Sequence, residues 1–184
     1  MSRIVAGTFK GRRIATPAGQ ATRPTSDRVR EALFGALGDF TGTRFADLYA
    51  GSGAVGLEAA SRGAAHVLLV ESDPRAGRVI RENIALLRAG TVARLAPSRV
   101  EHVLPGGPLG EPYDIVVADP PYSAPETELT ELLSGLVGYG WLAPDALVII
   151  ERSSRTPEPA WVPGITGERC RRYGETTLWY GRGL

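Results

Sequence analysis

The chain has 184 residues, of which 43% are hydrophobic and 22% are charged. This length suits one domain with its own core, and this composition excludes a disordered chain, a collagen and a coiled coil as the main description. The net charge of +1 hides a split, because residues 1–44 hold eight basic and three acidic residues while residues 45–184 hold 13 and 17. A basic arm on a mildly acidic body predicts an anionic partner; a solvated arm with no partner is the alternative.

Several classes of protein are disfavoured at once. No uncharged apolar run approaches the roughly 18 residues of a membrane span, and the first residues lack the apolar stretch of a signal peptide. We therefore expect a cytoplasmic protein without a membrane segment. Cys170 is the only cysteine, which excludes an intramolecular disulfide, and His66 and His102 are the only histidines. This set argues against a zinc site of the usual ligand count, so no metal is expected.

The first part of the chain is predicted to be a hairpin followed by a helix. Two short β-prone runs within residues 3–16 flank Phe9-Lys10-Gly11, and Thr25 or Ser26 can cap a helix. Its apolar face is expected at helical spacing, on Val29, Leu33, Ala36 and Leu37. We assign residues 1–42 to a basic arm and residues 43–184 to the main domain.

After residue 42, strands and helices alternate. Strands are expected at residues 45–50, 66–71, 92–96, 114–118, 146–150, 165–171 and 176–180. One helix should stop near Gly63, the next should begin at Asp73-Pro74 with Gly90 as its C′ residue, and a third should contain Leu129 and Leu136. Alternation predicts an α/β, Rossmann-like fold with a mostly parallel seven-stranded sheet and helices on both faces. The last two strands, with only a turn between them, should form an antiparallel hairpin.

A glycine-rich segment follows the first of these strands. Residues 51–56 read G-x-G-x-x-G before a helix, and Glu71 ends the next strand, 20 residues past Gly51. Glycines let the backbone turn tightly and approach a ligand, and an acid at the second strand end can bind both ribose hydroxyls. We predict a nucleotide-type cofactor site at Gly51, Gly53, Gly56, Glu71 and Ser72. A tight turn without a ligand is the alternative.

Asp47, four residues before Gly51, distinguishes two classes of cofactor. A dinucleotide places its pyrophosphate at the helix N-terminus and needs no acid there. S-adenosylmethionine has no phosphate and carries a cationic sulfonium and an amino-acid tail, near which an acid is favourable. The pattern therefore favours S-adenosylmethionine; a strand-to-loop hydrogen bond is the alternative role for Asp47.

A second motif, Asp119-Pro120-Pro121-Tyr122, follows the strand expected at residues 114–118. Ligands of open α/β sheets sit at the carboxyl ends of the strands, so we expect this motif to face the same crevice as the glycine loop. The two prolines fix the backbone and remove two N–H donors. A carboxylate, carbonyl groups and an aromatic ring remain, a set that accepts hydrogen bonds from an amine and stacks on a flat group. The alternative is a Pro-Pro turn with an exposed Asp.

The two motifs, at residues 47–56 and 119–122, resemble those of class I S-adenosylmethionine-dependent methyltransferases that modify exocyclic amines of nucleobases. Residues 3–7, 23–34 and 173–176 extend the resemblance to the bacterial RsmD family over nearly the whole chain, and residues 23–34 are its most specific piece. The resemblance implies methylation of N2 of a guanine, at position 966, in 16S ribosomal RNA. The sequence leaves open whether the partner is free RNA or an assembled 30S particle.

The resemblance also implies roles for individual residues. Asp119 and the Pro120 carbonyl would accept the N–H bonds of the amine, and Tyr122 would stack on the extruded base. Pro97-Ser98-Arg99 departs from the acid or asparagine often found at the third strand end, and we assign adenine contact to Ser98 or the Arg99 backbone. The predicted RNA contacts are Arg3, Lys10, Arg12, Arg13, Arg23, Arg28 and Arg30. Arg28 and Arg30 have an alternative role, pairing with Asp27 or Glu31.

Three other functions compete with this one. An adenine-N6 methyltransferase of DNA or RNA would use the same amine chemistry, although the 140 residues that follow residue 44 leave no room for a DNA-reading domain. A nicotinamide oxidoreductase would need a hydride-transfer site, and neither histidine lies in a motif resembling one. An RNA-binding protein without catalysis is disfavoured by the intact acids and Tyr122.

Overall fold

The structure is a computed structural model that describes residues 1–19 and 27–184. Two compact units divide the chain, Met1–Arg99 and Val100–Leu184. The predicted arm, residues 1–42, falls inside the first unit, and its division from the rest of the chain at residue 42 stays a prediction. The N-cap expected at Thr25 or Ser26 and the RNA contact expected at Arg23 lie outside the described residues.

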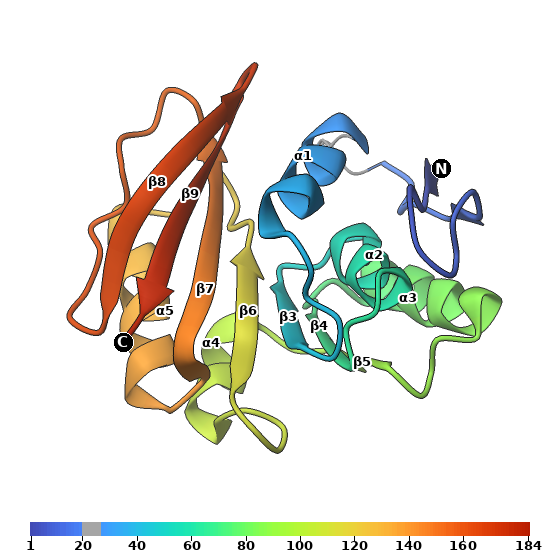
Figure 1. Cartoon of the computed structure of the whole chain (residues 1–184), viewed down its shortest axis with the longest axis horizontal. Coiled ribbons are helices and arrows are strands. Elements are labelled where there is room, and N and C mark those ends of the chain that lie inside the picture. Colours follow the sequence, from blue (N-terminus) through green and yellow to red (C-terminus); the bar gives the residue numbers. More distant parts are fainter. Residues whose placement is uncertain (20–26) are drawn as a thin grey trace. The chain divides into compact units, whose positions relative to one another are not determined.

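The first unit contains a small hairpin and an alternating run of strands and helices (Figure 1). In chain order its elements are β1 Ser2–Arg3, β2 Arg13–Ile14, α1 Asp27–Leu37, β3 Arg44–Leu48, α2 Ala54–Ser61, β4 His66–Val70, α3 Pro74–Leu87 and β5 Ala93–Ala96. Strands β1 and β2 pair antiparallel, which confirms the predicted hairpin, although each strand has only two residues. Strand β4 pairs in parallel with both β3 and β5.

The parallel strands form because their side chains are apolar on both faces. Every residue of the run Val67–Val70 is fully buried, as is Phe45 in β3. Strands buried on both faces read as continuous apolar runs, which is the pattern that predicted them. The predicted start of α3 is also confirmed: the Asp73 side chain accepts a hydrogen bond from the Arg75 N–H at 2.8 Å, and Pro74 opens the helix.

Two details of the helices differ from the prediction. Helix α3 ends at Leu87, and Arg88 (φ 54°), not Gly90, takes the left-handed conformation, because the Arg88 and Ala89 N–H groups bond back to Ala85 and Ile84. Helix α1 buries a stripe rotated from the predicted one: Ala36 is exposed, whereas Phe34 is buried. The Phe34 ring packs 5.5 Å from the Phe40 ring and 6.1 Å from the Phe45 ring, centroid to centroid, which explains the rotation.

The second unit contains the remaining strands. Its elements are α4 Val100–Val103, the short 3-10 helix η1 Leu104–Gly106, β6 Tyr113–Ala118, α5 Glu126–Gly138, β7 Leu142–Ser153, β8 Ile165–Tyr173 and β9 Thr176–Gly183. Strands β6 and β7 are parallel, β9 is antiparallel to β7, and β8 is antiparallel to β9. The helix α4 was not predicted, and β7 and β9 extend well beyond the expected ranges.

The predicted fold class is confirmed. Strands alternate with helices, the parallel pairs lie within each unit, and the last two strands form the expected antiparallel hairpin. Within residues 1–19 and 27–184, no helix has both the length and the apolar character that crossing a membrane requires.

Candidate functional site

The turn between β3 and α2 is built from residues with positive φ. Gly51 (φ 58°) and Gly53 (φ 82°) adopt this conformation, and so does Tyr49 (φ 65°). The Gly53 N–H donates to the Ala50 carbonyl oxygen at 2.8 Å and closes the turn. A Cβ added at Gly51 would meet no atom within 4 Å. Conformation rather than crowding therefore favours glycine here, and the Gly51 backbone is open on the side where a side chain would lie.

Gly56 has a different role, in packing. A Cβ at this position would lie 2.3 Å from Leu69 Cδ2, which is closer than real Cβ contacts allow, and 3.0 Å from Val67 Cγ1, which is tighter than most of them. Only glycine lets helix α2 approach strand β4 this closely. This is the part that the third glycine of a G-x-G-x-x-G segment plays in cofactor-binding α/β folds.

Asp47 is buried at the end of β3, with 4% of its surface exposed. Its Oδ2 accepts a hydrogen bond from the Gly56 N–H at 2.9 Å. The alternative role weighed for Asp47, a strand-to-loop hydrogen bond, is therefore present in the structure. Its role toward a cofactor stays a prediction.

Glu71 lies against the glycine loop, as the spacing predicts. Its Oε2 accepts the Gly51 N–H at 2.7 Å, and its Oε1 accepts the Asp73 N–H at 2.8 Å. A carboxylate oxygen can accept two hydrogen bonds, so each oxygen retains capacity for a ligand hydroxyl. The Ala96 carbonyl accepts both the Glu71 N–H at 3.2 Å and the Ser98 N–H at 2.9 Å, which brings the third strand end beside Glu71. Ser72 and Arg99, also predicted here, are exposed.

Asn83, on α3, was missed by the sequence reasoning. Its side chain is buried, and its Nδ2 donates to the Ser52 carbonyl and to the Ala15 carbonyl, both at 3.0 Å. Its Oδ1 accepts the Ala15 N–H at 2.8 Å. One amide thus joins the glycine loop to the N-terminal segment. The available signal was an asparagine at helical spacing between the apolar residues Ile80 and Leu87.

The Asp-Pro-Pro-Tyr motif begins where strand β6 ends, in the second unit. Asp119 is half-buried, Pro120 is buried, and Tyr122 has 64% of its surface exposed. The Pro121 carbonyl accepts the Ala124 N–H at 2.9 Å, which closes a turn after the prolines. The motif thus presents a carboxylate and an accessible ring on a rigid segment. That it shares a crevice with the glycine loop stays a prediction.

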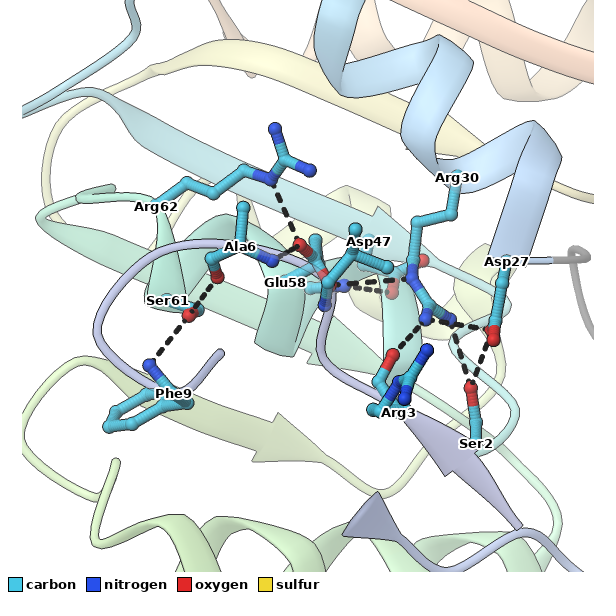
Figure 2. Close-up of polar contacts among 12 residues, drawn as sticks. Ser2, Arg3, Ala6, Phe9, Asp27, Arg30, Asp47, Glu58, Ser61 and Arg62 are labelled. Carbon is cyan, nitrogen blue, oxygen red and sulfur yellow. Dashed lines mark hydrogen bonds and ion pairs between the residues drawn. The ribbon is translucent and has the colours of Figure 1, made fainter. Parts of the chain in front are cut away.

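Arg30 corrects the predicted set of RNA contacts. Its side chain is fully buried, and two acids compensate its charge: Asp27 Oδ1 lies 2.9 Å from its Nη2 and Glu58 Oε2 lies 3.4 Å from its Nε (Figure 2). Its guanidinium also donates to the Ser2 hydroxyl at 3.1 Å and to the Arg3 carbonyl. A cation enclosed in this way is not a surface contact. The alternative of pairing with Asp27 is confirmed.

Glu58, on α2, completes this network and was also missed. Its carboxylate is fully buried and accepts the Val5 N–H at 2.9 Å. It also accepts the Ala6 N–H at 3.0 Å and the Arg62 Nε–H at 2.9 Å (Figure 2). A charged residue inside a helix of small and apolar residues was the signal. Glu58 fixes the backbone that follows β1, and with it the arm.

The other predicted cations of the arm are at the surface. Those that the structure describes as exposed are Arg3, Lys10, Arg12, Arg13 and Arg28. Arg12 also donates from Nη2 to the Leu86 carbonyl at 2.6 Å, which docks the hairpin on α3. Within the described ranges, no group of three or more His, Cys, Asp or Glu side chains is arranged to hold a metal ion.

The family is shown by comparison with known proteins. Residues 2–182 match the family described as conserved hypothetical protein 95. The chain belongs to this family, which is the RsmD family. Ribosomal RNA small subunit methyltransferase D of Escherichia coli strain K12 is 40% identical over 150 residues, covering 81% of this chain and 73% of its own. The protein of the same name from Haemophilus influenzae is 31% identical over 157 residues, covering 84% and 80%.

Solved structures agree with this assignment. The structure of YhhF from Escherichia coli matches with a TM-score of 0.86 at 35% identity, covering 99% of this chain and 97% of that chain. SMU.776, solved in complex with SAH, matches with a TM-score of 0.67 at 15% identity, covering 84% and 48%, and this likeness concerns the fold alone. The chain therefore has the methyltransferase fold predicted for it.

Proposed function

We propose that the protein transfers a methyl group from S-adenosylmethionine to N2 of a guanine in 16S ribosomal RNA, and that this guanine is at position 966, as the family resemblance implies. The observation that carries the proposal is the hydrogen bond from the Gly51 N–H to the Glu71 carboxylate, in a chain of the RsmD family. Relatives of the chain are named as ribosomal RNA small subunit methyltransferases. S-adenosylmethionine supplies an electrophilic methyl group on a sulfonium when it is bound.

The residues of the first unit fit this cofactor chemically. Glu71 retains one acceptor position on each carboxylate oxygen, which suits the two hydroxyls of a ribose. The backbone at Gly51 is open where a Cβ would lie, and Gly53 keeps the turn tight. Asp47 supplies negative charge for the cationic part. We assign adenine contact to Ser98 or the Arg99 backbone, near Glu71, and assign Ser72 to the ribose.

The residues of the second unit suit an exocyclic amine. The N2 lone pair of guanine is delocalised into the ring, so it is a poor nucleophile until the amine is oriented. The Asp119 carboxylate and the Pro120 carbonyl accept its two N–H bonds, which directs the lone pair toward the methyl group and lets orientation contribute most of the acceleration. Asp119 then takes a proton from the transiently cationic methylated amine. The exposed Tyr122 ring stacks on the base, an interaction worth roughly 1–3 kcal/mol.

The exposed cations of the arm bind RNA phosphates in this proposal. Arg3, Lys10, Arg13 and Arg28 carry surface charge, and Arg12 does so while it docks the hairpin. Arg23 belongs to the same proposed set. Such contacts supply affinity and salt dependence rather than sequence discrimination, so the choice of nucleotide rests on the substrate's own shape.

The test is transfer of labelled methyl groups from S-adenosylmethionine, with the modified base mapped afterwards. The substrates are free 16S rRNA and 30S particles, both from a strain that lacks the gene, with duplex DNA of matched length as the control. We expect label on N2 of one guanine of the RNA. Label on adenine N6 of DNA or RNA would establish the adenine alternative, and no transfer to any substrate would refute a methyltransferase.

A further inference from the structure

The edge strand of the second unit, β8, carries a row of arginines to which the proposed function assigns no role. Within the described residues β8 pairs only with β9, so its other edge has no partner strand (Figure 1). The five consecutive residues from Glu168 to Arg172 are all exposed. Three of them are arginines: Arg169, Arg171 and Arg172.

Positive charge is concentrated in the last part of the chain, which the division of charge at residue 44 does not reveal. Residues 45–151 hold seven basic and 14 acidic residues, whereas residues 152–184 hold six arginines and three glutamates. The one acid on this strand, Glu168, is already engaged by Arg182, with Nε–Oε1 at 2.6 Å and Nη2–Oε2 at 3.2 Å. In this bidentate pair, both oxygens of the Glu168 carboxylate accept hydrogen bonds from Arg182. The three arginines therefore keep the strand positive.

The register of the hairpin sets the directions of these side chains. Arg169 and Arg171 stand opposite Tyr180 and Leu178 and share one face of the strand, while Arg172 lies on the other. The Arg169 guanidinium carbon lies 4.7 Å from the centre of the Tyr180 ring. Burial raises the pKa of Tyr180 to about 12, so this ring is neutral at working pH and supports the cation as a π-face.

We propose that the exposed edge from Arg169 to Arg172 is a second phosphate-binding surface for the ribosomal RNA, separate from the N-terminal arm; this rests on the proposed function. Guanidinium groups match phosphate with paired N–H donors, and an edge strand presents them on both faces. A second protein strand fits less well, because the bulge between Gly167 and Arg169 and the like charges oppose edge-to-edge pairing.

The first experiment measures salt dependence. R171Q/R172Q removes two charges from the surface, and R75Q/R78Q removes two from the exposed side of α3 as the matched control. Binding of 16S rRNA is titrated between 50 mM and 300 mM salt. For two lost phosphate contacts we expect the log–log slope to fall by about 1.4–1.8, and the Kd at 150 mM salt to rise roughly 10- to 30-fold. The control should bind within about twofold of the native protein.

The second experiment uses Cys170, the only cysteine of the chain, which is exposed between Arg169 and Arg171. Saturating 16S rRNA should slow its alkylation by N-ethylmaleimide at least about fivefold in the native protein, and less in R171Q/R172Q. Unchanged alkylation with an unchanged salt slope would overturn the second surface, as would equal weakening of both variant pairs.

Methyl transfer by the same preparations separates the two proposals. If the native protein methylates the RNA while R171Q/R172Q binds it normally, only the second surface is refuted. If the native protein neither binds nor methylates RNA, the proposed function fails and the second surface fails with it. Self-association of R171Q/R172Q with normal RNA binding would show that the arginines protect the edge instead.

Discussion

The N-terminal arm and the β8 edge are both rich in arginine, yet they use it differently. In the arm, Arg30 is fully buried and its guanidinium holds the chain together through Asp27 and Glu58. On β8, Arg171 and Arg172 are exposed on a strand that is held by its backbone pairing with β9. Counting charges along the sequence does not separate these roles. The two roles are separated by the helix face on which a cation lies and by whether a buried acid pairs with it.

The largest effect should appear outside both regions, because the arm and the β8 edge contribute RNA binding in our proposals and Asp119 contributes the chemistry. Asp119→Ala should reduce methyl transfer by at least about 10²-fold, since it removes the group that orients the amine and takes its proton. Binding of S-adenosylmethionine, measured by calorimetry, should stay within about twofold. Tyr122→Phe, which keeps the stacking ring, is the matched control. Near-normal turnover in Asp119→Ala would remove Asp119 from the reaction.

The buried anchor of the arm should be the most sensitive point for stability. Glu58→Gln leaves the Arg30 guanidinium without its buried carboxylate, and breaking such a pair costs about 3–5 kcal/mol. Urea unfolding should show a loss of this order. Glu82→Gln on the exposed side of α3 should change the free energy of unfolding by less than about 0.5 kcal/mol. Equal stability of the two variants would mean that Arg30 and Glu58 do not anchor the arm.

Asn83 tests whether the arm and the glycine loop are physically linked. Asn83→Ala leaves the Ala15 backbone groups and the Ser52 carbonyl without this partner, at a cost of about 1–3 kcal/mol. Hydrogen exchange at the Ala15 amide should speed up, and affinity for S-adenosylmethionine should fall at the same time. Glu82→Ala, one residue earlier and exposed, is the control. Faster exchange with unchanged cofactor affinity would show that the arm and the loop are independent.

The smallest effect is expected from the surface of the arm. R12Q/R13Q should lower the salt slope of RNA binding by up to about 1.8, with stability reduced slightly because Arg12 also docks on Leu86. Comparing the salt slopes of R12Q/R13Q and R171Q/R172Q shows how the phosphate contacts are divided between the arm and the β8 edge. A native salt slope in R12Q/R13Q would remove these two arginines from the interface.

Much of the fold could be predicted because its signals are local. Continuous apolar runs marked β4 and β6, and the Asp73-Pro74 pair marked the start of α3. The end of α3 could not be predicted from the sequence, because backbone hydrogen bonds decide its cap. They place Arg88, not Gly90, in the left-handed conformation. Strand lengths were underestimated for β7 and β9, where polar residues continue the pairing beyond the apolar centre.

The candidate site also has features that the sequence predicted and features that it did not. The meeting of Gly51 with Glu71 followed from strand order and spacing, which topology fixes. Glu58 and Asn83 are held by partners up to 68 positions away in the chain, which no local pattern reports. Arg30 pairs with Asp27, which the sequence offered as an alternative, and also with the distant Glu58, which it did not. A buried polar residue on an apolar helix face was the one usable hint, and it does not name its partner.

The function proposed for the chain is methylation of a guanine amine of ribosomal RNA. The most direct measurement is methyl transfer to 16S rRNA and 30S particles from a strain without the gene, followed by mapping of the labelled nucleotide. We expect label on N2 of one guanine of the RNA with the native protein, and loss of this label with Asp119→Ala. Label on another base or another group, or equal transfer by Asp119→Ala, would contradict it.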